Sequence, residues 1–240
     1  MRIALIGYGR MGHEIEKIAI SRGHEIGLII DINNAGDLNL ENLKNIDVAI
    51  EFTTPLTAVK HYKICFDAGV PVVSGSTGWL SQWSEVSNYC LEKNAAFFYA
   101  SNFSLGVNLF FDLNQKLARL MKPFDQYHIE ITEVHHTKKL DAPSGTAITL
   151  AESVLAEYDE LTAWKNSPST EKDVLGIVSL REGDVPGIHT IKYESEVDFI
   201  EITHSAKSRA GFAFGAVIAA EFSLGKKGIL SMQELLNSKV

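Results

Sequence analysis

The residues from Glu133 to Ala147 combine acid–base side chains with an anion-binding pattern. Histidine titrates closer to neutral pH than other side chains, so His135 is a candidate general acid. Ser144, Gly145 and Thr146 directly precede an amphipathic stretch that we expect to be helical, and N–H groups at a helix start bind anions. The pattern predicts a site that holds an anionic substrate and gives it a proton. An ordinary helix cap and a basic surface loop are the plainer interpretations.

The adjacent histidines do not predict a zinc site. His135 and His136 would point to opposite faces of an extended chain. Neither a cysteine nor another histidine stands at the spacing that completes a zinc ligand set. One histidine is therefore expected to face the reacting atom and the other a bound carboxylate. The two cysteines, Cys65 and Cys90, lie in separate helix-like stretches and are expected to be buried apolar residues. No metal is predicted.

A glycine-rich sequence after the first apolar run predicts dinucleotide binding. Gly7, Gly9 and Gly12 have the spacing that permits a tight turn, a close approach to a pyrophosphate and close helix packing. Asp31 ends the second apolar run, about 20 residues after Gly12. Its carboxylate is expected to accept hydrogen bonds from the adenosine ribose. The predicted cofactor is NADH or NADPH, and NADH is favoured because no basic residue follows Asp31 in Ile32-Asn33-Asn34.

The elements that carry these motifs begin as an α/β domain. Five apolar runs alternate with helical stretches, at 1–6, 26–30, 47–52, 70–74 and 95–100. Such alternation is typical of a Rossmann-type, doubly wound parallel sheet that is covered on both faces. Two later loops, 52–55 and 75–78, follow strand ends, where such sheets bind ligands, although each alone could be an ordinary turn. They are expected to contact a ribose or the nicotinamide amide.

From residue 104 onward the pattern is α+β. A long helix is predicted over 105–121, with leucines on one side at 109, 113, 117 and 120. Strand-like segments lie at 127–134, 176–180, 189–195 and 199–205. The last three follow one another without intervening helices and so predict a mixed or antiparallel sheet. Further helices are predicted at 147–158 and 213–223. We assign residues 1–103 and 213–240 to a dinucleotide-binding domain, and 104–212 to a substrate-binding and oligomerisation domain.

The composition is that of an acidic globular protein. Of 240 residues, 45% are hydrophobic and 22% are charged, and the net charge is −8. These values exclude a disordered chain and argue against binding to nucleic acid or an anionic membrane. The first apolar run is too short for a signal peptide, and no later run is long enough to span a membrane, so a cytoplasmic protein is expected. An anionic substrate needs a local basic site, which the residues from His135 to Lys139 supply.

The segment from Glu133 to Ala147 matches the pattern E-x-H-H-x-x-K-x-D-A-P-S-G-T-A, and through it the chain resembles the 4-hydroxy-tetrahydrodipicolinate reductases, also called dihydrodipicolinate reductases. Further matches lie at 7–12, 52–53, 75–78, 102–108, 183–190 and 202–216. The resemblance implies a two-domain enzyme of lysine and diaminopimelate biosynthesis, usually a homotetramer. Such an enzyme reduces a cyclic dicarboxylate to tetrahydrodipicolinate with NADH or NADPH.

The resemblance also implies a role for each matching residue. His135 would be the proton donor and acceptor, and Lys139 a second proton donor. The substrate carboxylates would be bound by His136, Ser144, Gly145 and Thr146. The dinucleotide would be bound by Gly7, Tyr8, Gly9, Arg10, Met11, Gly12, Asp31, Phe52, Thr53, Gly75, Ser76, Thr77, Ala100, Ser101, Asn102 and Phe103.

Three departures from the family pattern concern the periphery of these sites. The segment from Asp31 to Asp47 is shorter than is usual, so the outer part of the sheet is expected to be trimmed. Glu182 stands where the family commonly has glycine, and the family's arginine after Asp31 is absent. Two other functions remain open from the sequence: another two-domain NAD(P)-dependent dehydrogenase, and a non-catalytic dinucleotide-binding sensor.

Overall fold

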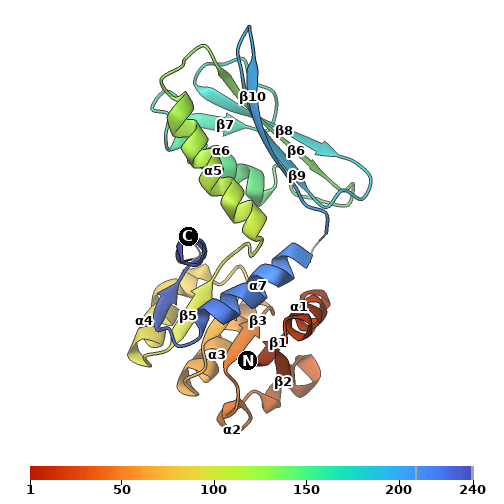
Figure 1. The fold of residues 1–240 in the computed structure, drawn as a ribbon, viewed down its shortest axis with the longest axis vertical. Coiled ribbons are helices and arrows are strands. Elements are labelled where there is room, and N and C mark those ends of the chain that lie inside the picture. The colour runs from red at the N-terminus through yellow and green to blue at the C-terminus, as the bar shows by residue number, and fades with distance from the viewer. Residues whose placement is uncertain (209, 239–240) are drawn as a thin grey trace. The chain divides into compact units, whose positions relative to one another are not determined.

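The structure is a computed structural model that describes residues 1–208 and 210–238, and the chain forms two compact units (Figure 1). The first unit is Met1–Leu105 with Ala210–Val240, and the second is Gly106–Arg209. These boundaries differ by two or three residues from those expected. The difference at the return to the first unit arises because the helix there begins at Ala210 rather than at residue 213.

The first unit contains the parallel sheet expected from the sequence. Its strand order is β11-β5-β4-β3-β1-β2 and every pair is parallel. The strands are β1 Arg2–Ile6, β2 Glu25–Ile30, β3 Val48–Glu51, β4 Val72–Ser74, β5 Ala96–Tyr99 and β11 Gly228–Leu230. The five predicted strands are confirmed. The sixth, β11, was not predicted, because three residues beginning with glycine are too short to produce a recognisable apolar run.

Helices cover both faces of this sheet, as a doubly wound fold requires. Alternate residues of β1 point to opposite sides: Ile3 and Leu5 pack with helices α1 and α7, whereas Ala4 and Ile6 pack with α3 and α4. The long helices are α1 Arg10–Ser21, α3 Pro55–Asp67, α4 Trp83–Glu92 and α7 Ala210–Ser223, and α8 is Met232–Asn237. The chain that returns from the second unit therefore completes the core of the first.

The sheet ends at β2, as the short segment after Asp31 predicted. Residues beyond β2 form a 3₁₀ helix, η1 Ile32–Asp37, and a single turn, α2 Leu40–Leu43, before β3 begins. A second 3₁₀ turn, η2 Leu80–Gln82, leads into α4. No further strand lies beyond β2 in the part of the chain that the structure describes.

The second unit is a mixed sheet with helices on it, which confirms the predicted α+β class. The strand order is β10-β9-β6-β8-β7; β9 is antiparallel to both neighbours, and β6, β8 and β7 are parallel. The elements are α5 Leu105–Met121, β6 His128–His135, α6 Gly145–Leu155, β7 Ala163–Lys165, β8 Val174–Arg181, β9 Ile188–Glu194 and β10 Phe199–Ser205.

The packed face of α5 is not its leucine side. Val107, Phe110 and Ala118 are buried, whereas Leu109 and Leu120 are 54% and 69% exposed. Among residues 1–208 and 210–238, no helix is both long enough and apolar enough to cross a membrane.

Candidate active site

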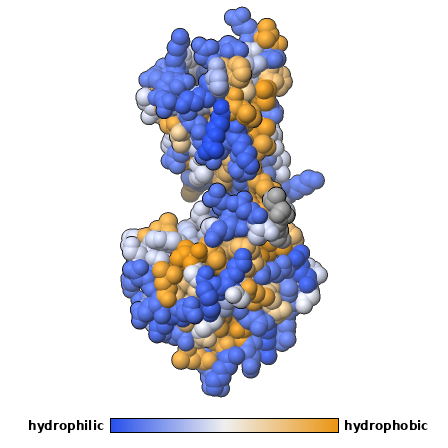
Figure 2. All heavy atoms as spheres, turned by 60° about the vertical axis from the view of Figure 1, so that its left-hand side comes forward, coloured by the Kyte–Doolittle hydropathy of each residue, from blue (hydrophilic) through white to orange (hydrophobic). Residues whose placement is uncertain are grey.

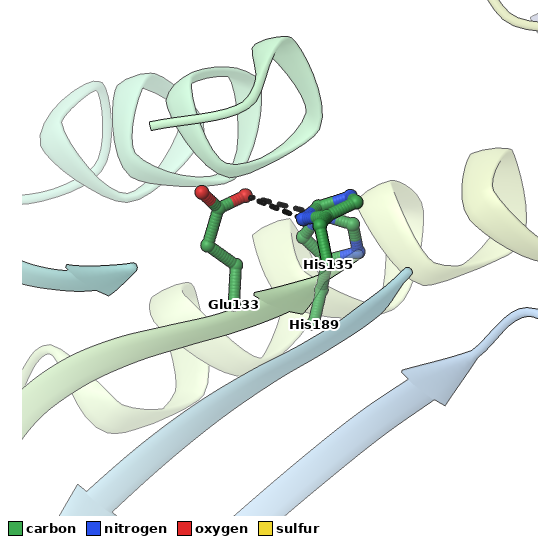
Figure 3. A group of neighbouring side chains, drawn as sticks. All are labelled: Glu133, His135 and His189. Atoms are coloured by element: carbon green, nitrogen blue, oxygen red, sulfur yellow. Dashed lines mark ion pairs between the residues drawn. The ribbon is translucent and has the colours of Figure 1, made fainter. Parts of the chain in front are cut away.

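Strand β6 carries an alternating row of buried residues that changes from apolar to ionisable. Ile129 and Ile131 pack against α6, and the next two positions of the same row are Glu133 and His135. The neighbouring strands complete the group, because His189 of β9 lies opposite Glu133 and Arg181 of β8 lies opposite His135. Figure 3 shows Glu133, His135 and His189 gathered at this end of the sheet.

Glu133 is the centre of the group and is fully buried. Its two carboxylate oxygens accept the backbone N–H of Ser144 at 3.0 and 3.1 Å, and Arg181 donates to Oε1 at 3.2 Å. Oε2 lies 3.3 Å from Nδ1 of His135 and 3.7 Å from Nε2 of His189. Burial alone would raise the pKa of Glu133, but the polar groups around it, first His189 and then Ser144, hold it far below its usual range.

His135 is 8% exposed, and burial lowers its pKa to about 4. The Glu133 carboxylate opposes this shift, whereas the positive charges of Lys139 and Arg181 add to it. Gly187 makes room for the ring, because a Cβ at that position would lie 3.0 Å from Nε2 of His135. The imidazole is therefore neutral at neutral pH in the ligand-free protein, and negative charge bound beside it would favour its protonated form.

The turn that holds the backbone of His135 accommodates Glu182. The N–H of Glu182 donates to the carbonyl oxygen of His135 at 2.8 Å, and its side chain is exposed. The left-handed residue of this turn is the next one, Gly183, with φ of 46°. A glycine at position 182 is therefore not required by the backbone.

The start of α6 has the features expected of an anion site. Ser144 is its N-cap: Oγ accepts the N–H of Ala147 at 3.2 Å and lies 3.1 Å from Nε2 of His189. The first N–H groups of a helix have no partner within it, and the side chain of Ser144 satisfies only that of Ala147. The backbone N–H groups of Gly145 and Thr146 are therefore available to bind an anion. Gly145 is exposed and Thr146 is half-buried.

Lys139 and His136 lie in the connection between His135 and α6. Lys139 Nζ donates to both carboxylate oxygens of Asp141, at 2.8 and 2.7 Å. Arg181 donates to the carbonyl oxygen of Asp141 at 2.7 Å and so ties this connection to β8. His136 is half-buried, and its Nδ1 has no hydrogen-bond partner among the described residues. Lys139 is thus held by an acidic neighbour in the ligand-free protein.

Three residues of this site received no role from the sequence: Glu133, Arg181 and His189. The spacing of Glu133 and His135 was a usable signal, because residues two apart on a strand share a face. His189 and Arg181 could not be identified this way, because their positions depend on strand pairings between distant segments.

Glu133, His135 and His189 also offer a possible set of metal ligands. One atom from each lies within 4.8 Å of the others. Two imidazoles and a carboxylate suit zinc and similar ions. The same carboxylate, however, already accepts hydrogen bonds from Ser144 and from the cationic Arg181. The absence of a metal stays a prediction.

In the first unit, the glycine-rich loop has the close packing that its sequence implies. Gly7 has φ of 93°, and a Cβ there would lie 2.1 Å from the carbonyl oxygen of Phe52. A Cβ at Gly12 would lie 2.5 Å from the carbonyl oxygen of Gly7. Gly9 is the N-cap of α1 and has open space around it. The geometry leaves room for a phosphate at the start of α1.

Asp31 follows β2 directly and is exposed. Its N–H donates to Oδ1 of Asn34 at 2.7 Å, and Nδ2 of Asn34 donates to the carbonyl oxygen of Ile29 at 2.9 Å. Asn34 thereby holds the backbone at Asp31 while the carboxylate faces solvent. This position suits contact with a ribose.

The other residues expected to bind the dinucleotide differ in accessibility. Gly9, Arg10, Thr77 and Ser101 are exposed; Gly7, Tyr8, Met11, Phe52, Thr53, Gly75, Ala100 and Asn102 are half-buried; Gly12, Ser76 and Phe103 are buried. The hydroxyl of Tyr8 donates to Glu16. The side chains of Ser76 and Phe103 are 4% and 2% exposed and pack inside the unit.

Comparison with known proteins finds the same family in both units. The family model described as "Dihydrodipicolinate reductase, N-terminus" matches residues 1–103, and "Dihydrodipicolinate reductase, C-terminus" matches residues 106–236. The chain is 49% identical to a 4-hydroxy-tetrahydrodipicolinate reductase of Christiangramia forsetii, over 99% of this chain and 98% of the relative.

Two more distant proteins agree with this. A 4-hydroxy-tetrahydrodipicolinate reductase of Neisseria meningitidis is 34% identical, over 92% of this chain and 83% of the relative. The solved structure of a dipicolinate-bound dihydrodipicolinate reductase from Paenisporosarcina has a TM-score of 0.77 at 24% identity, over 96% of this chain and 97% of the other. The latter likeness supports the fold.

Proposed function

The chain belongs to the dihydrodipicolinate reductase family, and we propose that it performs this family's reduction with the residues around Glu133. It is an NAD(P)H-dependent oxidoreductase whose substrate is 4-hydroxy-tetrahydrodipicolinate. The observation that carries the site assignment is the hydrogen bonding of Glu133 to Ser144, beside His135. One buried carboxylate thereby joins an anion-binding helix start to an acid–base side chain.

The reaction needs a hydride, a proton and a place for two carboxylates. NAD(P)H supplies the hydride when it is bound. One substrate carboxylate lies at the N–H groups of Gly145 and Thr146, where the helix dipole favours negative charge. His136, the half-buried residue that follows His135, binds the other carboxylate. His135 donates the proton that balances the hydride.

The negative charge of the substrate prepares His135 for this step. In the ligand-free protein the pKa of His135 is about 4 because the ring is buried. Carboxylates bound nearby favour the protonated imidazole and raise that pKa. Lys139 acts as a second proton donor once the substrate's negative charge competes with Asp141 for its ammonium group.

Replacement of the two proposed proton donors tests these roles. His135→Ala and Lys139→Ala are each expected to lower kcat by about 10²- to 10⁴-fold while the Kd for reduced nicotinamide is retained. Turnover is followed as loss of reduced-nicotinamide absorbance, with substrate made in place by the synthase that condenses pyruvate with aspartate semialdehyde. His128→Ala is the matched control, because His128 is an exposed residue of the same strand. Near-normal turnover of either variant would contradict its role.

The cofactor preference and the assembly are part of the same proposal. We infer a preference for NADH from Asp31 and from the absence of a cation in the three residues after it.

We also infer a cytoplasmic homotetramer. Apolar patches interrupt the hydrophilic surface in Figure 2. Three apolar side chains on or beside the edge strand β10 are exposed: Val197 by 88%, Phe199 by 59% and Ile200 by 41%. Light scattering of the purified chain measures the mass of the assembly.

A further inference from the structure

Glu51 is a second fully buried carboxylate, and the mechanism above does not use it. It is the last residue of β3, near the middle of the parallel sheet. Oε1 accepts the N–H of Thr53 at 3.2 Å, the hydroxyl of Ser76 at 3.1 Å and the hydroxyl of Thr53. Oε2 accepts the hydroxyl of Ser74 at 2.7 Å. One side chain therefore joins the loop after β3 to the loop after β4.

A carboxylate at this position sets the direction of every hydroxyl around it. Because Glu51 can only accept, Ser76 and Ser74 must donate to it. The oxygen of Ser76 is then left to accept the N–H of Thr53 at 2.8 Å, and that of Ser74 accepts the N–H of Ser76 at 3.2 Å. The hydroxyl of Tyr62 lies 2.7 Å from Ser74 Oγ and can donate to it as well. The two loops are thus cross-linked through backbone groups.

The residue that follows Glu51 extends this link to the glycine-rich loop. The ring of Phe52 lies so close to Gly75 that a Cβ there would be 2.1 Å from it. The carbonyl oxygen of Phe52 lies against Gly7 in the same way. A shift of the backbone at Glu51 would therefore move both contacts.

Hydrogen-bond donors, more than cations, surround the carboxyl group of Glu51. Among the described residues its ion-pair partner is His61, with Nδ1 3.7 Å from Oε1. Burial and, secondarily, the negative charge of Glu51 raise the pKa of Tyr62 above its ordinary value. Burial of a carboxylate among apolar groups costs free energy unless hydrogen bonds satisfy its oxygens. Four donor groups satisfy this buried carboxylate, so its loss would leave the loops of Thr53 and Ser76 without their shared acceptor.

The strand order shows which part of a dinucleotide these loops face. Asp31 at the end of β2 suits the adenosine ribose, and the glycine-rich loop after β1 suits the pyrophosphate. Strands β3 and β4 lie on the other side of β1 from β2. A dinucleotide laid across the carboxyl ends of the strands therefore has its nicotinamide half at the loops of Thr53 and Ser76.

We propose that Glu51 is a positioning residue for the nicotinamide half of the cofactor, which it never touches, and that it acts through the Thr53 and Ser76 loops. This rests on the proposed dinucleotide binding. It also gives Ser76 a different task from the one expected, because its buried hydroxyl links Glu51 to Thr53 instead of contacting the cofactor.

The test compares NADH with ADP, which lacks the nicotinamide half. In Glu51→Gln the amide nitrogen donates where the carboxylate accepted, so at least one serine hydroxyl must reverse its direction. We expect the Kd for NADH to rise about 10-fold, as for loss of one hydrogen bond to a charged group. The Kd for ADP should stay within about 2-fold. Glu85→Gln, on the exposed side of α4, is the control and should change neither value.

Equal weakening of NADH and ADP would overturn the proposal, because a general loss of structure acts on both ligands. Unchanged NADH binding would overturn it as well. If Glu51→Gln does not fold, Ser76→Ala breaks the same link and is expected to weaken NADH but not ADP. If both single variants fold, the double variant should bind NADH no more weakly than the weaker-binding single variant. Additive losses of NADH affinity would mean that Ser76 contacts the cofactor directly. A wild-type chain that binds ADP but not NADH contradicts the proposed function itself.

Discussion

The backbone N–H of Ser144 donates to both carboxylate oxygens of Glu133, at 3.0 and 3.1 Å. This contact joins the start of α6 to the end of β6, two elements whose connection contains His136 and Lys139. Because His135 lies 3.3 Å from the same carboxylate, the proposed anion site and the proposed proton donor share one support. A change at Glu133 should therefore affect both.

We expect Glu133→Gln to lower the free energy of unfolding of the second unit by about 3 kcal/mol, as when one partner of a buried ion pair is removed. Arg181 would keep its carbonyl partners but lose its carboxylate. Urea denaturation followed by circular dichroism measures the change. Glu130→Gln is the control, because Glu130 lies on the other face of β6 and is half-buried. Equal losses in the two variants would show that the contacts of Glu133 add nothing.

Local sequence patterns were sufficient to predict most of the strands of the first unit. The continuous apolar runs predicted β1 to β5, since strands covered on both faces need no polar alternation. The same reasoning failed for β11, whose three residues carry no periodicity. It also did not reveal which side of α5 is packed. Leu109 and Leu113 are as apolar as a core pair, and only the tertiary contacts show that Phe110 and Ala118 face the sheet.

The candidate site was predictable to the extent that it is contiguous in the sequence. His135 and Ser144 lie on one segment with a recognisable pattern, whereas His189 joins them through the pairing of β6 with β9. Ser76 illustrates another limit. Its position in a loop after a strand predicts ligand contact, which stays a prediction, whereas the hydrogen bond from its hydroxyl to the buried carboxylate of Glu51 could not be predicted from the sequence. Residue type and spacing do not show which polar groups a fold satisfies internally.

Binding of a dicarboxylate should be accompanied by proton uptake. The pKa of His135 is about 4 in the ligand-free protein and rises when negative charge binds beside it. At pH values between the free and the bound pKa, the complex holds up to about one proton more per chain than the free protein. Below about pH 4 the free protein already holds that proton, so the uptake should vanish.

Calorimetry of a pyridine dicarboxylate in buffers with different ionisation enthalpies measures this uptake. In His135→Gln, which cannot take up the proton, binding is expected to be independent of the buffer. Uptake that persists unchanged in this variant would assign the proton to another group, such as His136 or His189.

Removal of metal ions should leave the reductase activity unchanged. In the proposed mechanism the hydride comes from the nicotinamide and the proton from His135. The one cluster of possible ligands among the described residues has the cationic Arg181 beside its carboxylate. Turnover before and after dialysis against a chelator measures the effect. Activity that is lost and then restored by Zn²⁺ but not by Mg²⁺ would instead identify Glu133, His135 and His189 as a metal site, and His189→Gln should then abolish the recovery.

Asp31 should decide between the two nicotinamide cofactors. In the proposed binding mode its exposed carboxylate lies where the 2′-phosphate of NADPH would be, and Asn34 keeps the backbone there in position. Two like charges close together at a protein surface repel each other by about 1 kcal/mol or more, so we expect Asp31→Asn to shift the ratio of kcat/KM for NADH to that for NADPH about 10-fold towards NADPH. The shift should shrink at high salt, because exposed charges are screened. Glu41→Gln, an exposed change in the same short segment, should leave the ratio unaltered. A wild-type chain that strongly prefers NADPH, with the same ratio in Asp31→Asn, would mean that the adenosine ribose does not lie at Asp31.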